Sequence, residues 1–178
     1  MNMWTEDLVL PEELRKERLQ KEPASYTAWI LGKSGKTQEK KRKAVIICPG
    51  GGYEHLSPRE GEPIAMKYLA MGYHVFVLHY SLAPERFPTA LRELALLTAK
   101  IREHADEWRI DSEGIIVSGF SAGGHLALSL GVHWDKEWLS GPLGLTPEQI
   151  RPNGLILCYP VVTAGEGCHR CSVERLLW

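Results

Sequence analysis

Charge of one sign, long apolar runs and cysteine are all scarce in this sequence of 178 residues. Lys and Arg number 21 against 22 Asp and Glu, so no net field attracts nucleic acid or an anionic membrane. Residues 1–19 contain acidic side chains and no unbroken apolar run, and no later stretch is as long as a membrane span. We therefore expect a cytoplasmic protein without a signal peptide or anchor, and with no nucleic-acid or membrane partner.

The sequence has only four cysteines: Cys48, Cys158, Cys168 and Cys171. The last two form a C-x-x-C pair with His169 between them. A structural zinc site takes four ligands, usually from two such pairs, and this sequence has no second pair. We therefore expect reduced, free thiols with no metal and no cofactor. Zinc binding or redox use of the C-x-x-C pair is the less favoured alternative.

Apolar and charged residues occur in ordinary globular proportions, 44% hydrophobic and 24% charged. A chain of this length buries a sizeable core as one domain. No internal repeat and no linker-like composition marks a boundary. We predict a single domain over residues 1–178.

Short apolar runs alternate with helical patterns along the chain. Residues 25–31 alternate between two faces and suit a strand. Four other runs are rich in Val, Ile and Leu without clean alternation, which is typical of parallel strands buried on both faces: 44–48, 74–80, 114–119 and 154–159. Helical patterns cover residues 63–71, 89–108 and 122–131. This alternation predicts an α/β fold with a mostly parallel sheet and helices on both faces.

Two polar segments complete the predicted layout. Residues 12–21 are charged and predict a surface helix or a loosely held arm. Residues 33–43 are rich in lysine without interleaved aromatics, so we expect a solvated hairpin loop rather than a phosphate-binding surface.

The stretch Gly119-Phe120-Ser121-Ala122-Gly123 matches G-x-S-x-G between a predicted buried strand and a predicted helix. This is the setting of a nucleophile elbow, a tight turn that exposes a catalytic serine. Small residues let neighbouring backbone approach, and the helix N-terminus favours developing negative charge. We predict Ser121 as the nucleophile and the Ala122 amide as one oxyanion donor. The alternative is a small-residue turn needed only for helix–sheet packing.

A second glycine-rich stretch, C-P-G-G-G-Y at residues 48–53, directly follows the predicted strand 44–48. Acyl transfer places negative charge on a carbonyl oxygen, and preorganised backbone amides stabilise that charge. Gly51 and Gly52 are the best candidates for these oxyanion-hole donors. The alternatives are a flexible turn or a phosphate-binding loop, but neither common phosphate-loop pattern is present.

These two motifs and the stretches S-L-A-P-E-R-F-P-T-A-L (81–91) and 109–131 resemble the α/β-hydrolase esterases. The resemblance is to bacterial carbohydrate esterases of the acetylxylan- and feruloyl-esterase type, which are related to the hormone-sensitive-lipase group. Pro49 stands where the lipase group has the histidine of His-Gly-Gly-Gly. The resemblance runs from about Tyr26 to the chain end and implies a small acyl ester as substrate, with acetylated sugars as one class.

In this fold the triad follows the chain order serine, acid, histidine. By the resemblance, the acid follows the seventh strand and the histidine the eighth, whereas the run at 154–159 matches the sixth. We therefore expect the chain to be truncated at its carboxyl end relative to the family, without the last two strands, the acid and the histidine.

No local residue is a convincing substitute for the missing acid and histidine. Glu166 and His169 satisfy the chain order, but their stretch resembles a part of the family that is not the triad. His55 and His79 lie at the predicted catalytic rim and are more often surface or substrate residues. His125 is one helical turn beyond Ser121, where we expect it to be packed or hydrogen-bonded. We expect the remaining histidines, His74, His104 and His133, at the surface or at helix ends.

Three hypotheses follow. In the first, the chain is a serine hydrolase of small esters that acts through an acyl-enzyme on Ser121, with weak or no activity because the triad is incomplete. In the second, it is a non-catalytic, degenerate hydrolase fold or gene remnant that binds a small ligand. In the third, a second chain completes the site, since the run 154–159 would form an apolar edge strand open to homodimer pairing.

Overall fold

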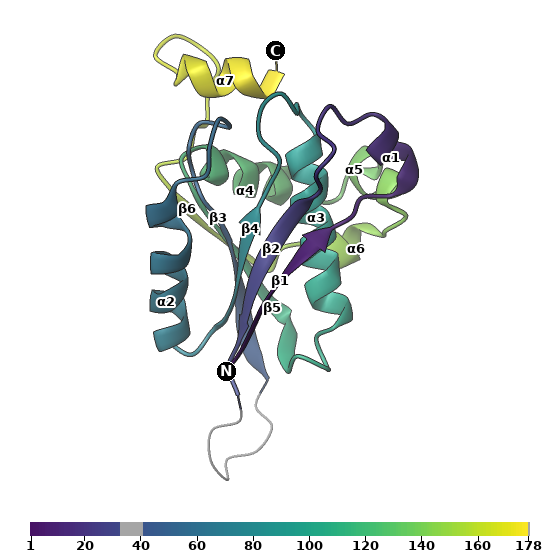
Figure 1. Cartoon of the computed structure of the whole chain (residues 1–178), viewed down its shortest axis with the longest axis vertical. Coiled ribbons are helices and arrows are strands. Elements are labelled where there is room, and N and C mark those ends of the chain that lie inside the picture. The colour runs from purple at the N-terminus through teal and green to yellow at the C-terminus, as the bar shows by residue number, and fades with distance from the viewer. Residues whose placement is uncertain (33–40, 178) are drawn as a thin grey trace.

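The computed structural model describes residues 1–32 and 41–177 and contains one six-stranded sheet with helices on both faces (Figure 1). The strands are β1 (Asn2–Leu8), β2 (Ala24–Ile30), β3 (Arg42–Cys48), β4 (His74–His79), β5 (Ile110–Phe120) and β6 (Gly154–Cys158). The helices are α1 (Glu12–Lys16), α2 (Glu62–Ala70), α3 (Thr89–Glu103), α4 (Ala122–His133), α5 (Glu137–Ser140), α6 (Pro147–Ile150) and α7 (Arg170–Leu177). Two short 3-10 helices are η1 (Pro58–Glu60) and η2 (Gly141–Leu143).

The strand order is β1-β2-β4-β3-β5-β6. The pairs β3–β4, β3–β5 and β5–β6 are parallel, whereas β1–β2 and β2–β4 are antiparallel. The predicted α/β fold with a mostly parallel sheet is therefore confirmed. Because the parallel strands β3, β4, β5 and β6 share one direction, their carboxyl ends meet at one edge of the sheet.

β1 is a strand that the sequence did not predict. Its residues alternate poorly and include charged Glu6 and Asp7, which are depleted in strands. The charge is accommodated because β1 lies at the sheet edge and Glu6 has partners there. Its carboxylate accepts a hydrogen bond from the Tyr26 hydroxyl at 2.6 Å and lies 2.6 Å from the Lys100 ammonium.

The prediction that residues 33–43 form a hairpin loop is wrong, because the two strands on either side of this segment are not neighbours in the sheet. β2 and β3 flank this segment, but β4 lies between them in the sheet. Residues 33–40 lie outside the described residues. Next to β4, the apolar residues of β2 are buried on both faces of the sheet. The local sequence of β2 does not specify which strand it pairs with.

The helix predicted at 63–71 is confirmed as α2, with Pro63 in its first turn and Gly72 just beyond its end at φ +92°. α3 begins at Thr89 as predicted but ends at Glu103 rather than at residue 108. Beyond it the amide of Ile110 donates to the carbonyl of Ala105 at 2.7 Å, and the chain turns into β5.

The segment that follows α1 is not a loosely held arm. The side chains of Arg18 and Glu85 are only 5% and 4% exposed and form an ion pair of 3.4 Å. Glu93 of α3 is fully buried and accepts hydrogen bonds from the Ser81 amide at 2.8 Å and the Ser81 hydroxyl at 2.6 Å. This buried polar cluster fixes the amino-terminal segment against the loop that precedes α3.

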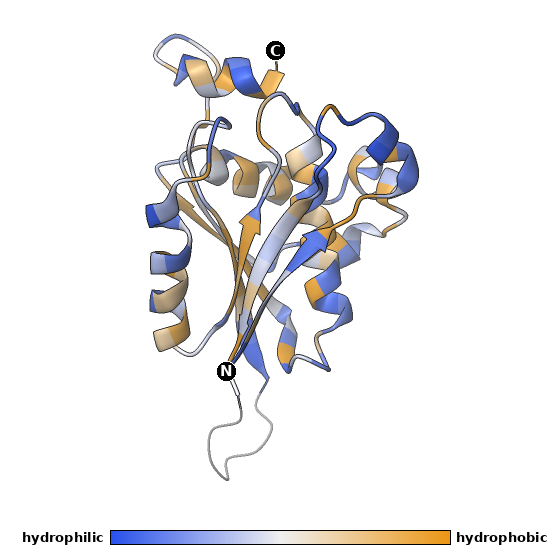
Figure 2. Ribbon diagram, viewed as in Figure 1, coloured by the Kyte–Doolittle hydropathy of each residue, from blue (hydrophilic) through white to orange (hydrophobic). Residues whose placement is uncertain are grey.

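The core has two layers, one on each face of the sheet. The larger layer packs α3 and α4 against the sheet, and the smaller one packs Ala65 and Leu69 of α2 against β3 and β4. Apolar residues gather along the central strands in Figure 2. Within residues 1–32 and 41–177, no helix has both the length and the apolar character that a membrane crossing requires.

β6 departs from the prediction that its run is buried on both faces. It occupies the edge of the sheet, and Leu155, Ile156 and Leu157 are 37%, 37% and 36% exposed. The expectation of an apolar edge strand at this run is confirmed. In the described structure, only β5 pairs with it.

Candidate active site

Ser121 lies in the sharp turn between β5 and α4, at the edge where the parallel strands end. Its backbone has φ 53° and ψ −116°, a conformation that a residue with a side chain adopts at an energetic cost. A Cβ built on Gly119 or Gly123 would come within 3.0 Å of backbone carbonyl oxygens, of Gly123 and Cys48 respectively. The flanking glycines are therefore required by close backbone approach, as an elbow demands.

Backbone hydrogen bonds hold the elbow in place. The Ser121 amide donates to the carbonyl of Cys158 at 3.0 Å, and the Ser121 carbonyl accepts from His125 at 3.0 Å and Val161 at 3.2 Å. Ala122 begins α4, so its amide lies at the helix N-terminus. These contacts tie the turn to the end of β6 as well as to its own helix.

The glycine loop, residues 49–53, follows β3 and packs against the elbow. A Cβ built on Gly50 would lie 3.0 Å from the Cβ of Ser121. Gly51 and Gly52 have φ +125° and +66°, which favour glycine. Within the described residues, the amides of Gly51, Gly52 and Ala122 donate to no protein acceptor. The structure thus places the glycine loop against the predicted nucleophile at Gly50, one residue before the predicted donor Gly51.

Two histidines near the site, His125 and His79, are hydrogen-bonded to other side chains. Nδ1 of His125 lies 2.9 Å from the Tyr53 hydroxyl, and burial lowers the pKa of His125, which favours the neutral ring. Nε2 of His79 lies 3.1 Å from the hydroxyl of Thr27. The expectation that His125 is hydrogen-bonded is confirmed. Among the described residues, no histidine nitrogen forms a hydrogen bond with the hydroxyl of Ser121.

His74 was expected at the surface, and that prediction is wrong. It is 1% exposed because it opens β4 inside the sheet, and its Nδ1 accepts a hydrogen bond from the Leu31 amide at 3.0 Å. Burial lowers the pKa of His74 to about 4, so the ring is neutral at pH 7. His74 is a structural residue of the strand.

Glu166 and His169 are not joined by a hydrogen bond in the described structure. Nδ1 of His169 instead lies 2.7 Å from the hydroxyl of Ser172 in α7, and Glu166 is exposed. His169 nevertheless lies beside the glycine loop, with its Cε1 3.9 Å from a Cβ built on Gly52. The pair does not have the acid–histidine contact that a triad requires.

All four cysteines are free, and Cys48 is buried, which raises the pKa of its thiol. Within residues 1–32 and 41–177, no three His, Cys, Asp or Glu side chains gather closely enough to hold a metal ion. His169, the residue inside the C-x-x-C pair, is engaged with Ser172.

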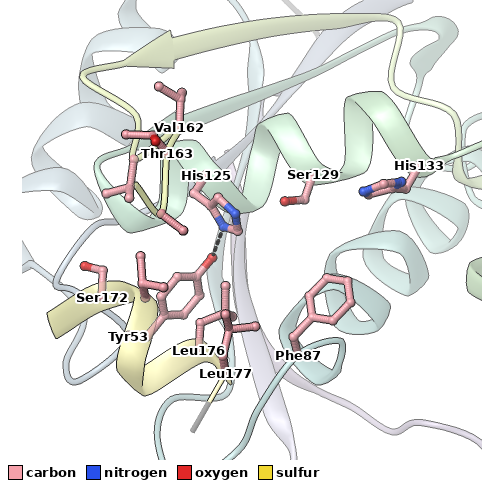
Figure 3. A pocket seen from close by; sticks show the side chains of 13 residues that line it. Tyr53, Phe87, His125, Ser129, His133, Val162, Thr163, Ser172, Leu176 and Leu177 are labelled. Carbon is pink, nitrogen blue, oxygen red and sulfur yellow. Dashed lines mark hydrogen bonds between the residues drawn. The ribbon is translucent and has the colours of Figure 1, made fainter. Parts of the chain in front are cut away.

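α7 lies over the glycine loop and closes one side of a cavity of about 250 Å³ (Figure 3). The guanidinium of Arg175 pairs with Glu54 at 2.8 Å, and the carbonyl of Leu176 accepts from the amide of Phe87 at 2.9 Å. The wall combines polar groups of Tyr53, His125, Ser129 and Thr163 with apolar side chains of Phe87, Val162, Leu176 and Leu177. The cavity suits a small ligand with both apolar and hydroxyl-like groups.

Sequence reasoning missed two side chains of this site, Tyr53 as the partner of His125 and Glu60 as a partner of the glycine loop. The carboxylate of Glu60 accepts from the Gly50 amide at 2.8 Å and from the Tyr159 hydroxyl at 2.5 Å. Glu60 belongs to a polar stretch whose composition carries no such signal. Tyr53 directly follows the glycines, so its position next to the motif was the only available indication.

The family model BD-FAE matches residues 33–153 of this chain. Endo-1,4-beta-xylanase B of Butyrivibrio fibrisolvens is 36% identical over 141 residues, which are 77% of this chain and 22% of that protein. The acetylxylan esterase of Xylanibacter ruminicola is 30% identical over 125 residues, which are 70% of this chain and 24% of that protein.

Solved structures share the fold. The acetyl ester-xyloside bifunctional hydrolase of Caldicellulosiruptor lactoaceticus superposes with a TM-score of 0.83 at 29% identity, over 98% of this chain and 63% of that one. The chain therefore spans under a quarter of the two curated relatives and about three-fifths of the solved one. With the family model matching more than half of its residues, this chain belongs to the BD-FAE family of α/β-hydrolase esterases.

Proposed function

We propose that this chain carries the nucleophile and oxyanion hole of a serine esterase that hydrolyses small, acetyl-type carboxylic esters. Ser121 attacks the ester carbonyl and forms an acyl-enzyme, the alcohol leaves, and water then releases the acid. Amides of Gly51, Gly52 and Ala122 donate to the oxyanion of each tetrahedral intermediate. No metal or other cofactor takes part.

The observation that carries this proposal is the strained backbone of Ser121 at φ 53°, enforced by glycines that admit no side chain. Strain of this kind persists where the surrounding structure compels it and often marks a functional site. The glycine loop contacts the elbow at Gly50, and the amides of Gly51 and Gly52 that follow donate to no protein acceptor among the described residues.

A proton acceptor for Ser121 is missing from the described residues, 1–32 and 41–177, since none of their histidines forms a hydrogen bond with its hydroxyl. We propose that the triad acid and histidine lie outside this sequence. Loss of a triad histidine costs on the order of 10⁶-fold in turnover, while the oxyanion hole and binding leave about 10³-fold over water. The 178 residues alone are therefore expected to have weak, Ser121-dependent activity, far below that of a complete triad.

The test compares hydrolysis of p-nitrophenyl acetate by the chain and by its Ser121→Ala variant. Slow release of p-nitrophenol that disappears in the variant, with a covalent acetyl adduct on Ser121 by mass spectrometry, is the expected result. Equal rates in both proteins and no adduct would refute a nucleophilic Ser121. The second candidate, a non-catalytic fold that binds a small ligand in the cavity, would then be favoured.

A homodimer that pairs through β6 is a further candidate partner arrangement, favoured by the exposed apolar residues of that strand. Leu155, Ile156 and Leu157 offer both apolar side chains and an edge that only β5 pairs within the described residues. Edge strands of this kind pair readily with another chain. Adduct formation that increases with protein concentration would support completion of the site by a second copy.

A further inference from the structure

We propose that Glu60 is a positioning residue that sets the distance between the two halves of the oxyanion hole. It bridges the glycine loop to the strand end that holds the Ser121 elbow. The inference rests on the proposed function, because the hole matters only if Ser121 forms a tetrahedral intermediate.

The first contact of the bridge lies on the glycine loop. One carboxylate oxygen of Glu60 accepts a hydrogen bond from the Gly50 amide at 2.8 Å. A Cβ built on Gly50 would lie 2.7 Å from that oxygen and 3.0 Å from the Cβ of Ser121. The Gly50 backbone is therefore enclosed between the carboxylate and the nucleophile. Because Glu60 takes the Gly50 amide, the donors left for substrate on this loop are Gly51 and Gly52.

The second contact lies just beyond β6. The other carboxylate oxygen of Glu60 accepts from the Tyr159 hydroxyl at 2.5 Å. Tyr159 follows Cys158, whose carbonyl accepts the amide of Ser121 at 3.0 Å. Tyr159 also has φ 38°, a strained value for a residue with a side chain. The bridge thus runs from the glycine loop through Glu60 and Tyr159 to the backbone that anchors Ser121.

Glu60 would favour the reaction through the positions that it holds and not through its charge. A carboxylate near a developing oxyanion repels it, so the charge of Glu60 does not itself stabilise the transition state. A carboxylate is nevertheless suited to the bridge because both of its oxygens accept hydrogen bonds. In glutamine an NH2 donor replaces one accepting oxygen, so the Tyr159 hydroxyl must turn from donor to acceptor and both contacts become neutral hydrogen bonds, which weakens the bridge. If the charge alone mattered, this substitution would raise turnover; if the bridge matters, turnover falls.

The kinetic test measures Ser121-dependent hydrolysis of p-nitrophenyl acetate in Glu60→Gln and Tyr159→Phe. Complete loss of one oxyanion donor lowers turnover by ~10²-fold or more. A donor that is displaced but still present is expected to lower turnover by less. We expect kcat to fall about 10-fold in Glu60→Gln, and less in Tyr159→Phe, with KM unchanged in both. An equal or higher kcat in Glu60→Gln would overturn the proposal, as would a rise in KM alone.

Two matched substitutions serve as controls. Glu62→Gln removes the same charge from an exposed residue nearby that has no side-chain partner among the described residues. Tyr73→Phe removes a hydroxyl that forms no hydrogen bond in the described structure. Both are expected to leave kcat and thermal stability unchanged, so a fall confined to the bridge variants is not a general effect of substitution.

Nuclear magnetic resonance gives a readout that does not depend on activity. In Glu60→Gln, hydrogen exchange at the Gly50 amide is expected to accelerate, and the amide signals of Gly51, Gly52 and Ala122 to shift. Unchanged exchange and unchanged signals would overturn the bridge, whether or not the chain is active.

The titration of Tyr159 tests the second contact separately. The hydrogen bond to Glu60 raises the pKa of the Tyr159 hydroxyl to about 12, and Glu60→Gln is expected to bring it back towards 10. If the parent chain shows no Ser121-dependent turnover, the proposed function fails, and the exchange and titration results still decide whether Glu60 positions the loop.

Discussion

The fully buried carboxyl of Glu93 makes the stability of this fold depend on pH in a specific direction. Burial raises the pKa of Glu93 from 4.5 to about 7, although hydrogen bonds from Ser81 and the charge of Arg18 act in the opposite sense. Glu85 also faces the group and raises the pKa further. Glu93 therefore favours its protonated form in the folded chain.

The sign and size follow from the difference between the folded and unfolded states. Below pH 4.5 both states hold the proton, so Glu93 imposes no ionisation cost. Between pH 4.5 and about 7 the unfolded chain has lost the proton while the folded chain keeps it, so stability falls as the pH rises. At about 1.4 kcal/mol per pKa unit, the total loss is about 3 kcal/mol and levels off above pH 7.

Glu93→Gln keeps the shape of the side chain and removes its ionisation. The altered hydrogen bonds of the variant change its free energy of unfolding by the same amount at every pH. The cost of keeping a buried carboxyl protonated, which depends on pH, is absent from the variant. The free energy of unfolding of the variant, relative to the parent chain, is therefore expected to rise by about 3 kcal/mol between pH 4.5 and 7. Urea unfolding followed by tryptophan fluorescence at several pH values measures this difference.

Glu103→Gln is the matched control, since Glu103 is an exposed glutamate at the end of the same helix. Its unfolding free energy is expected to follow that of the parent chain at every pH. A Glu93→Gln variant that also keeps a constant separation from the parent chain would refute the reasoning. Glu93 would then be ionised throughout, with Arg18 compensating its charge.

Two further predictions concern the elbow and the sheet edge. Gly123→Ala is expected to destabilise the chain by about 3 kcal/mol or more in urea unfolding, because the added Cβ meets the Cys48 carbonyl. Gly144→Ala is the control: its Cβ would meet no atom within 4 Å, so the substitution is expected to cost only the ~1 kcal/mol that a positive φ imposes. Equal losses would show that the elbow relaxes. Ile156→Lys or Leu157→Lys on β6 is expected to reduce concentration-dependent association of the chain, measured by analytical ultracentrifugation. The midpoint of thermal unfolding is expected to stay the same. Unchanged association would show that β6 is not the contact between two copies.

Much of the fold could be predicted because its central strands are unusually apolar. The runs that became β3, β4 and β5 have to be buried on both faces, and only a sheet covered by helices on both sides buries them. β1 escaped prediction because an edge strand exposes half of its residues and admits charge. The helix boundary at Glu103 was also missed, since a backbone hydrogen bond rather than a glycine or proline ends the helix.

The candidate site divides in the same way. Ser121 and its flanking glycines could be recognised because backbone crowding at an elbow dictates small residues at fixed spacing. The partners of Glu60 could not, since Gly50 and Tyr159 are far apart in sequence and meet only when β3 and β6 are both placed beside β5.

The sequence alone therefore determined the type of fold and the position of the nucleophile motif, because both depend on local burial and local backbone geometry. Tertiary structure alone decided the strand order, the burial of His74, the Arg18–Glu85–Glu93 cluster and the bridge through Glu60. The physical reason is that charged and polar side chains carry no local sign of their partners. Their environment is set only when distant segments pack together.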